Sequence, residues 1–170
     1  PSVGRWLAVS DSPGVAGLTS GSAAQAEALA DELEPRLSWV PTLVVAQRHK
    51  PTSGGIDRLR AALLRLSARF AGQVEPSLVI CRALAQLAQL AGDEDEARRW
   101  AHHGLKLDPY CATLAMVLSW VPDEAENAGE PARAVLARVN ARHPGYRDVA
   151  AALKRRERID KHTETRRRAA

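Results

Sequence analysis

The sequence predicts an all-helical domain built from antiparallel helix pairs, and three observations lead to this prediction. Apolar residues recur at steps of three and four over several long stretches, which is the period of one helix face. Aromatic residues make up 4% of the 170 residues, whereas the strong helix formers Ala, Leu and Arg are frequent. The two clearest helical patterns meet at Gly92 and Asp93, and the second stops at Asp108 and Pro109. A helix hairpin of this size needs neighbours on either side to bury its faces.

Ahead of the helices, residues 1–22 are expected to form a loop-rich segment. Residues 11–22 are rich in Gly and Ser and contain one Pro, which favours loop over helix. A phosphate-binding loop would end in Gly-Lys-Ser or Gly-Lys-Thr, and that ending is absent from this stretch. We expect the helical domain over residues 23–160 and a basic tail over residues 161–170.

The domain is expected to begin with a helix over residues 23–37, which Pro35 interrupts or ends. The next segment is ambiguous, because two adjacent valines favour strand locally, whereas packing between helices favours helix. We expect a helix over residues 41–49. Residues 50–55, KPTSGG, predict a break.

Residues 56–71 form the cleanest amphipathic pattern. The expected apolar side consists of Ile56, Leu59, Leu63, Leu64, Ser67 and Phe70. The rest of the surface carries Arg58, Arg60, Arg65 and Arg69. A basic stripe of this kind can bind phosphates, or it is a solvated helix face, and Arg58, Arg65 and Arg69 are the candidate contacts.

The central pair of helices has clear start and stop signals. Pro76 and Ser77 are suited to the start of its first helix, and Gly92 is suited to the end, because Gly enters the left-handed cap without steric cost. Asp93 can cap the second helix, and Pro109 prevents its continuation. The expected inward residues of the first helix are Leu78, Cys81, Leu84, Ala85, Ala88 and Ala91. Those of the second helix are Ala97, Trp100, Ala101, Gly104 and Leu105.

This pair, residues 77–109, resembles a tetratricopeptide repeat, a helix-turn-helix unit of about 34 residues. The matching residues are Leu84, Ala85, Ala88, Gly92, Asp93, Glu96, Ala97, Trp100, Leu105, Asp108 and Pro109. The sequence departs from the family at Cys81 and Ala88, where aromatic residues are frequent, and at Gly104, where Ala is usual. The resemblance implies an α-solenoid of antiparallel helix pairs, a TPR-like superhelix. Because such stacks normally need about three repeats, the flanks are expected to supply degenerate units.

Three more helices are expected after Pro109. The first spans residues 110–121, the second residues 131–142 and the third residues 146–159. Their expected inward residues are Leu114, Val117, Leu118 and Val121; Ala134, Val135, Ala137 and Val139; and Tyr146, Val149, Ala150 and Leu153.

The connections between these helices are also expected from composition. Residues 123–130 form an acidic segment, and Pro144-Gly145 predicts a turn. The far end of the third helix, KRRERIDKH, is polar on all sides, which suits a solvent-facing cap. The last eight residues are expected to fray.

The resemblance also implies a binding surface, because the first helix of each tetratricopeptide unit lines a concave groove. The corresponding positions in this sequence are Val79, Arg82, Gln86 and Gln89 and, one unit further on, Thr113, Met116 and Trp120. Arg82 and the two glutamines can hydrogen-bond a peptide backbone or acidic side chains, whereas Met116 and Trp120 offer apolar contact. Trp120 is equally consistent with a core position.

The net charge of +4 is uneven along the chain. Residues 154–170 contain eight basic and three acidic residues, a net of +5, and the remaining chain contains sixteen basic and seventeen acidic residues, a net of −1. The basic tail adds Arg155 and Arg156 to the candidate phosphate contacts. Nucleic-acid binding through helix 56–71 and this tail is therefore an alternative function.

No catalytic or metal-binding constellation emerges from the sequence. His102 and His103 are adjacent, so on a helix their side chains diverge by about 100°. Cys81 and Cys111 lie in apolar helical patterns and are expected to be reduced core thiols. We expect no cofactor, no metal and no enzymatic activity.

The cellular context is read from the same residues. No apolar run approaches the roughly 18 residues needed to span a membrane. Two reduced thiols and the lack of a signal-peptide layout favour the cytoplasm. The chain begins at Pro1 rather than Met, which predicts a fragment of a longer protein or a processed product.

We therefore expect a non-catalytic scaffold or assembly subunit that holds a segment of another protein in its groove. Nucleic-acid binding is the first alternative, and a helical accessory domain of a larger enzyme is the second. These residues specify neither the partner nor an oligomeric state.

Overall fold

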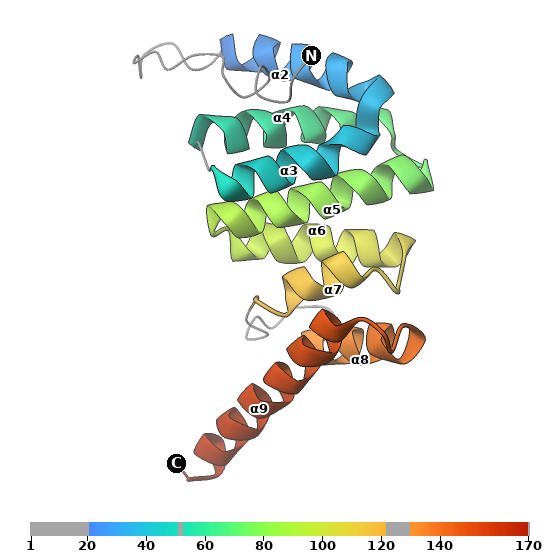
Figure 1. The fold of residues 1–170 in the computed structure, drawn as a ribbon. Helices are drawn as coiled ribbons and strands as arrows, with labels where there is room; N and C mark the ends of the chain where they lie inside the picture. The colour runs from blue at the N-terminus through green and yellow to red at the C-terminus, as the bar shows by residue number, and fades with distance from the viewer. Residues whose placement is uncertain (1–20, 51–52, 122–129, 170) are drawn as a thin grey trace.

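The computed structural model describes residues 21–50, 53–121 and 130–169, and the regular structure in these ranges is entirely helical. The helices are stacked along the long axis of the molecule, with α2 at one end, α9 at the other, and α4 rather than α3 next to α2 (Figure 1). No helix in the described ranges is long and apolar enough to cross a membrane. The all-helical prediction is confirmed.

The first half of the chain contains α2 (Gly21–Leu33), the 3₁₀-helix η1 (Glu34–Trp39), α3 (Val40–His49) and α4 (Ser53–Arg69). The helix predicted over 41–49 is confirmed. The predicted interruption of the helix over 23–37 at Pro35 is confirmed, because α2 ends at Leu33 and η1, with a non-helical Arg36, continues the chain. The predicted break over 50–55 is wrong in its second half, because α4 already begins at Ser53.

The central pair consists of α5 (Val74–Ala91) and α6 (Glu94–Leu107). Gly92 adopts the left-handed conformation with φ 76°, and the side chain of Asp93 accepts a hydrogen bond from the Glu96 backbone N–H at 2.9 Å, so both predicted caps are confirmed. The predicted start is wrong. α5 begins before Ser77, whose hydroxyl donates instead to the Phe70 carbonyl oxygen at 2.9 Å.

The last helices are α7 (Ala112–Leu118), α8 (Ala132–Arg142) and α9 (Arg147–Ala169). α7 is shorter than the predicted helix over 110–121, although Val121 is buried as expected. The predicted fraying of the last eight residues is wrong, because α9 continues to Ala169. The predicted segments 1–22 and 123–130 lie almost entirely outside the described residues.

Two hydrophobic clusters form the interior, and α5 belongs to both. The first cluster joins α2, α3, α4 and one face of α5 through residues that include Leu33, Val44, Leu63, Leu66, Ile80, Leu84 and Leu87. The second joins another side of α5 to α6, α7, α8 and α9 through residues that include Ala85, Ala88, Ala97, Ala101, Leu114, Leu136 and Val149. α5 is therefore buried on two faces rather than on the single predicted face.

Several predicted inward residues lie outside this interior. Leu64 is 40% exposed, and Leu66 is buried in its place. In α8, Ala134 and Ala137 are exposed, whereas Leu136 is buried. Ala91 and Tyr146 were likewise predicted inward and are exposed. In each case the position of a neighbouring helix, rather than the local period, selects the buried side.

The two cysteines are free and buried, as predicted. Burial raises the pKa of the Cys81 thiol to about 11 and also raises the pKa of the Cys111 thiol. Both are therefore uncharged core side chains at neutral pH.

The helices contact one another in a regular order. α3 contacts α5, α5 contacts α7, and α7 contacts α9. The helices between them pack onto the next in line, with contacts of α4 to α5, α6 to α7, and α8 to α9, while α2 packs on α4. α3, α5, α7 and α9 are therefore successive neighbours.

Candidate functional site

The candidate site begins on the side of α5 that neither hydrophobic cluster covers. The four residues predicted to line a groove on this helix, Val79, Arg82, Gln86 and Gln89, are all half-buried. Their spacing of three, four and three residues places them along one side of the helix. α5 is otherwise among the most buried helices, so this polar side is a distinct surface.

Arg82 connects this surface to the next helix in the row. Its Nη2 donates a hydrogen bond to Oγ1 of Thr113 on α7, at 3.2 Å. A guanidinium carries five N–H donors, and this is its one hydrogen bond to another side chain in the described part of the chain. The structure thus brings together two predicted groove residues from separate units.

A hollow lies beyond Thr113, between α7 and the beginning of α9. Its volume is about 580 Å³, within the range of small-ligand and peptide side-chain pockets. Its lining consists of Ala112, Thr113, Met116, Gly145, Tyr146, Arg147, Asp148 and Val149. Tyr146 is 48% exposed and stacks on His143 with ring centroids 5.0 Å apart. Sequence reasoning assigned Tyr146 to the apolar interior and so missed its place at this surface.

Trp120 lies just past the end of α7 and is exposed, with 57% of its surface accessible. Of the two positions that the sequence allowed for Trp120, core or surface, the structure shows the surface one. The guanidinium of Arg155 on α9 lies over its ring, 4.6 Å from the centroid, in cation–π geometry. Arg155 was predicted as a phosphate contact, and the structure places it beside a groove residue instead.

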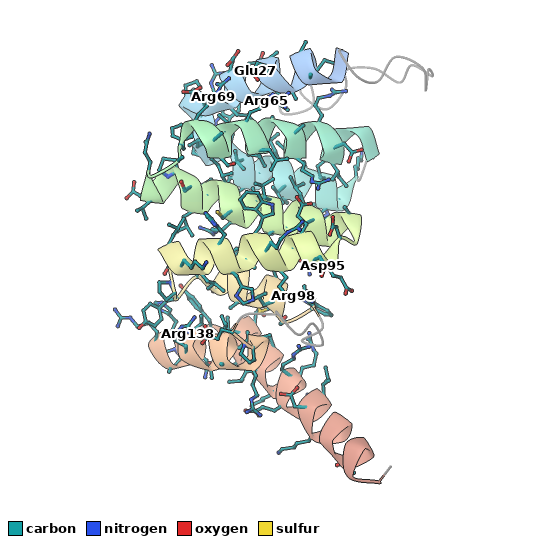
Figure 2. All side chains as sticks on the ribbon, turned by 180° about the vertical axis from the view of Figure 1, so that it is seen from behind. Glu27, Arg65, Arg69, Asp95, Arg98 and Arg138 are labelled. Carbon is teal, nitrogen blue, oxygen red and sulfur yellow. The ribbon has the colours of Figure 1, made fainter. Side chains whose placement is uncertain are left out.

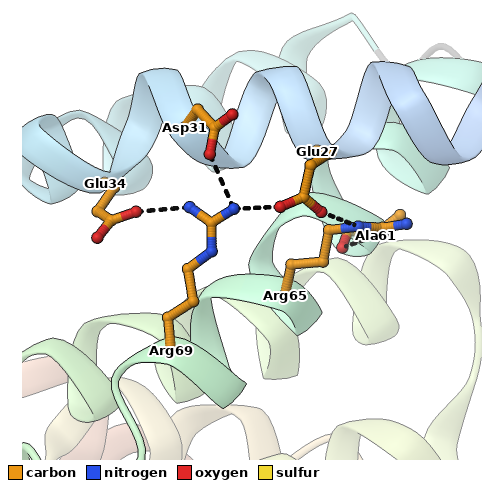
Figure 3. Close-up of polar contacts among 6 residues, drawn as sticks. All are labelled: Glu27, Asp31, Glu34, Ala61, Arg65 and Arg69. Carbon is orange, nitrogen blue, oxygen red and sulfur yellow. Dashed lines mark hydrogen bonds and ion pairs between the residues drawn. The ribbon is translucent and has the colours of Figure 1, made fainter.

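The arginines of α4 are held by acidic residues of α2 and η1. Arg69 contacts Glu27, Asp31 at 2.8 Å and Glu34 at 2.5 Å, and Arg65 contacts Glu27 at 2.7 Å (Figure 3). Hydrogen bonds to these carboxylates raise the pKa of Arg69, and the bond to Asp31 has the largest effect. Three carboxylates therefore already neutralise the two guanidinium groups that were candidates for phosphate contact.

The other two candidate phosphate contacts are also engaged. Arg58 is half-buried and makes an interaction within the protein. Arg156 was predicted on a solvated surface, but only 8% of it is exposed, and its Nη2 donates to the Val121 carbonyl oxygen at 3.2 Å. The prediction of Arg156 as a surface contact is wrong, because α9 packs against α7 on this side.

An ion pair with a buried carboxylate, which sequence reasoning missed, joins α4 to α6. Glu96 is 5% exposed, and Arg60 approaches both of its carboxylate oxygens, with Nη2 at 2.5 Å and Nε at 3.1 Å. Nε1 of Trp100 donates to the same carboxylate at 3.3 Å. In the sequence, Glu96 looks like an ordinary acidic residue in the first turn of a helix. Its pairing depends on the position of α4.

A second hollow of about 390 Å³ lies at the turn between α4 and α5. Its mostly apolar wall includes Cys81, Trp100 and Leu107. The hydroxyls of Ser67 and Ser77 line it, but each already donates to a main-chain carbonyl oxygen, that of Leu64 and that of Phe70 respectively. This hollow therefore presents few polar groups for orienting a ligand.

Within the described ranges, no three His, Cys, Asp or Glu residues are grouped so that they could hold a metal ion. His103 packs edge-on against Trp100, with centroids 5.9 Å apart, and His102 also makes an interaction within the protein. The two adjacent histidines therefore lie in different environments, His102 half-buried and His103 exposed beside Trp100.

Comparison with known proteins gives no match: no protein family, no curated protein and no solved structure is similar to this chain. The protein is therefore described by its own structure. It is an all-helical protein with a half-exposed polar and aromatic surface that runs from α5 across α7 to the start of α9.

Proposed function

We propose that this protein is a TPR-like α-solenoid that binds an extended segment of a partner protein in a groove along α5, α7 and α9. The order of helix contacts supports the solenoid arrangement. Alternate helices α3, α5, α7 and α9 contact one another in succession, and α4, α6 and α8 each pack on the next unit. This is the pattern expected when helix hairpins stack one upon the next.

The observation that carries the proposal is the hydrogen bond from Arg82 to Thr113. It connects the polar side of α5 to Thr113, the one polar side chain of α7. The same surface leads to the hollow lined by Met116 and Tyr146. An extended peptide binds best to a surface that offers hydrogen-bonding groups and side-chain pockets in sequence.

The chemistry of this surface suits a peptide with mixed character. Arg82, Gln86 and Gln89 offer donors and acceptors for backbone groups or acidic side chains. Met116 and Trp120 offer adaptable and aromatic contact of the kind found at binding hot spots. The expected partner segment thus carries polar or acidic residues at one end and apolar residues at the other.

The proposal is tested by affinity capture at low and high salt. The groove variant combines Arg82→Glu with Gln86→Ala, and a matched control combines Arg99→Glu with Gln25→Ala, which makes the same changes at exposed positions of α6 and α2. Both variants should retain the helical content and melting temperature of the wild type. A protein captured by the wild type and the control, at both salt concentrations, should be lost with the groove variant.

Photocrosslinking then locates the contact. A photoreactive amino acid at Gln89 or Met116 should crosslink the captured protein, and the same amino acid at Arg99 should not. Equal crosslinking from Arg99, or capture that survives the groove variant, would show that the partner binds elsewhere.

A further inference from the structure

The basic residues of α4 and those of α9 differ in whether carboxylates pair with them. On α4, Arg65 and Arg69 are neutralised by carboxylates of α2 and η1, and Arg60 is neutralised by Glu96. Other basic residues of the body are paired as well, Arg98 with Asp95 at 2.8 Å and Arg138 with Glu130 at 2.5 Å (Figure 2). Several basic residues of the body are therefore paired with carboxylates, whereas others in the described ranges, such as Arg99, Lys106 and Arg142, lie singly at exposed positions of α6 and α8.

The outer part of α9 differs from the body. Lys154, Arg158 and Lys161 are exposed, and steps of four and three residues place them on one face of the helix. In the described part of the chain no carboxylate pairs with any of these three side chains. Asp160 pairs with Arg133 of α8 at 3.8 Å, and Glu157 is exposed beside the face. We call Lys154, Arg158 and Lys161 the basic face of α9.

The basic face is also physically accessible. α9 packs on α7 and α8 near its beginning, and its C-terminal half points away from the other helices (Figure 1). Lys154 and Lys161 are separated by seven residues, or about 10 Å along the helix axis. This separation is comparable with the width of the major groove of duplex DNA, about 12 Å.

The composition of this part of α9 discriminates between anionic partners. Helices that lie on membranes need an apolar face, and between residues 154 and 169 the sequence has Ile159 as its one large apolar residue. Proteins that bind single strands stack bases on aromatic side chains, and this stretch contains no Phe, Tyr or Trp. A rigid basic helix without these features suits the phosphates of a duplex.

We propose that the basic face of α9 binds duplex nucleic acid through its phosphate backbone, without sequence preference. This site is independent of the groove along α5 and α7. It also places the phosphate contacts on α9 rather than α4, because Arg65 and Arg69 of α4 are paired with carboxylates of α2 and η1.

The test measures binding of a fluorescent duplex of about 20 base pairs by anisotropy, between about 50 and 200 mM salt. The α9 variant changes Lys154, Arg158 and Lys161 to Gln. A matched control changes Arg99, Lys106 and Arg142 to Gln, which removes the same charge at exposed positions of α6 and α8. The groove variant Arg82→Glu plus Gln86→Ala serves as a second control.

The α9 variant should bind about tenfold more weakly or worse at the lowest salt, and the slope of log K against log salt should become shallower by about 3. Both controls should bind as the wild type does. An equal loss in the charge-matched control would overturn the proposal, because bulk charge would then explain binding. Failure of the wild type to bind duplex would also overturn it, as would equal competition by polyglutamate or by vesicles containing anionic lipid.

Discussion

Gly104 of α6 lies against Leu114 of α7 so closely that a Cβ atom on Gly104 would overlap Cδ1 of the leucine. The same Cβ would lie 3.0 Å from Cβ of Cys81 on α5. Three helices therefore meet at one backbone position. The resemblance to tetratricopeptide repeats implies Ala at this position, and the structure gives the physical reason for Gly: Leu114 fills the space that a methyl group would take.

Gly104→Ala should lower the free energy of unfolding by about 1–2 kcal/mol, because overpacking a filled core costs about 1–3 kcal/mol and exceeds the gain of about 1 kcal/mol in helix propensity. Urea denaturation measures this change. The same substitution in a Leu114→Ala background should cost less, since the space is then open. A Gly104→Ala protein as stable as the wild type would show that Leu114 can move aside.

Arg60→Ala should destabilise the protein by about 1–3 kcal/mol, because it leaves the carboxylate of Glu96 buried without its cation. Arg60 is itself 38% exposed, so solvent screening keeps the effect below that of a fully buried pair. Arg98→Ala is the control, because the Asp95–Arg98 pair is far more exposed on its acidic side and should contribute less than about 0.5 kcal/mol. Equal effects of the two substitutions would contradict this interpretation.

High salt should loosen α2 before the rest of the protein. Its attachment to α4 combines the buried residues Ala26, Ala30 and Leu33 with the ion pairs of Arg65 and Arg69. The α2 carboxylates of these pairs are more than half exposed, so added salt weakens the electrostatic part of the attachment. Hydrogen exchange of the amides of α2 should therefore accelerate in salt, whereas exchange in α6 should not. Arg69→Gln should reproduce the effect at low salt. Uniform acceleration across all helices would indicate global destabilisation instead.

Stability should fall as pH rises from 9 to 11. The pKa of Cys81 is raised from 9.0 to about 11 in the folded state, so the unfolded chain loses its proton first and is favoured across this interval. The contribution is fully present below pH 9. Unfolding free energies measured at closely spaced pH values should show this decline, and Cys81→Ala should make it less steep. A decline of identical slope in the variant would assign the effect to other groups, Cys111 included.

Local signals in the sequence predicted the helix boundaries best where a single residue determines the backbone. Gly92 must occupy a left-handed position, and Asp93 accepts a hydrogen bond from an amide three residues away. Neither feature depends on distant residues. Ser77 shows the limit of such signals, because a hydroxyl that can cap a helix can also bond to a distant carbonyl, here that of Phe70.

The choice of buried faces and of free charges depends on neighbouring helices, so the sequence alone predicted it less well. α5 is buried on two sides because it lies between two clusters, and its period reveals only one of them. Arg69 and Lys161 look alike in the sequence. Their difference arises because α2 folds onto α4 and brings three carboxylates to Arg69.

The shared position of α5 in the two hydrophobic clusters makes the molecule hard to divide. A fragment that ended at Ala91 would keep the first cluster but would leave Ala85 and Ala88 facing water. A fragment that began at Glu94 would lose one wall of the second cluster. Because α5 contributes to both clusters, removing either half of the protein would expose buried residues of the other half to solvent.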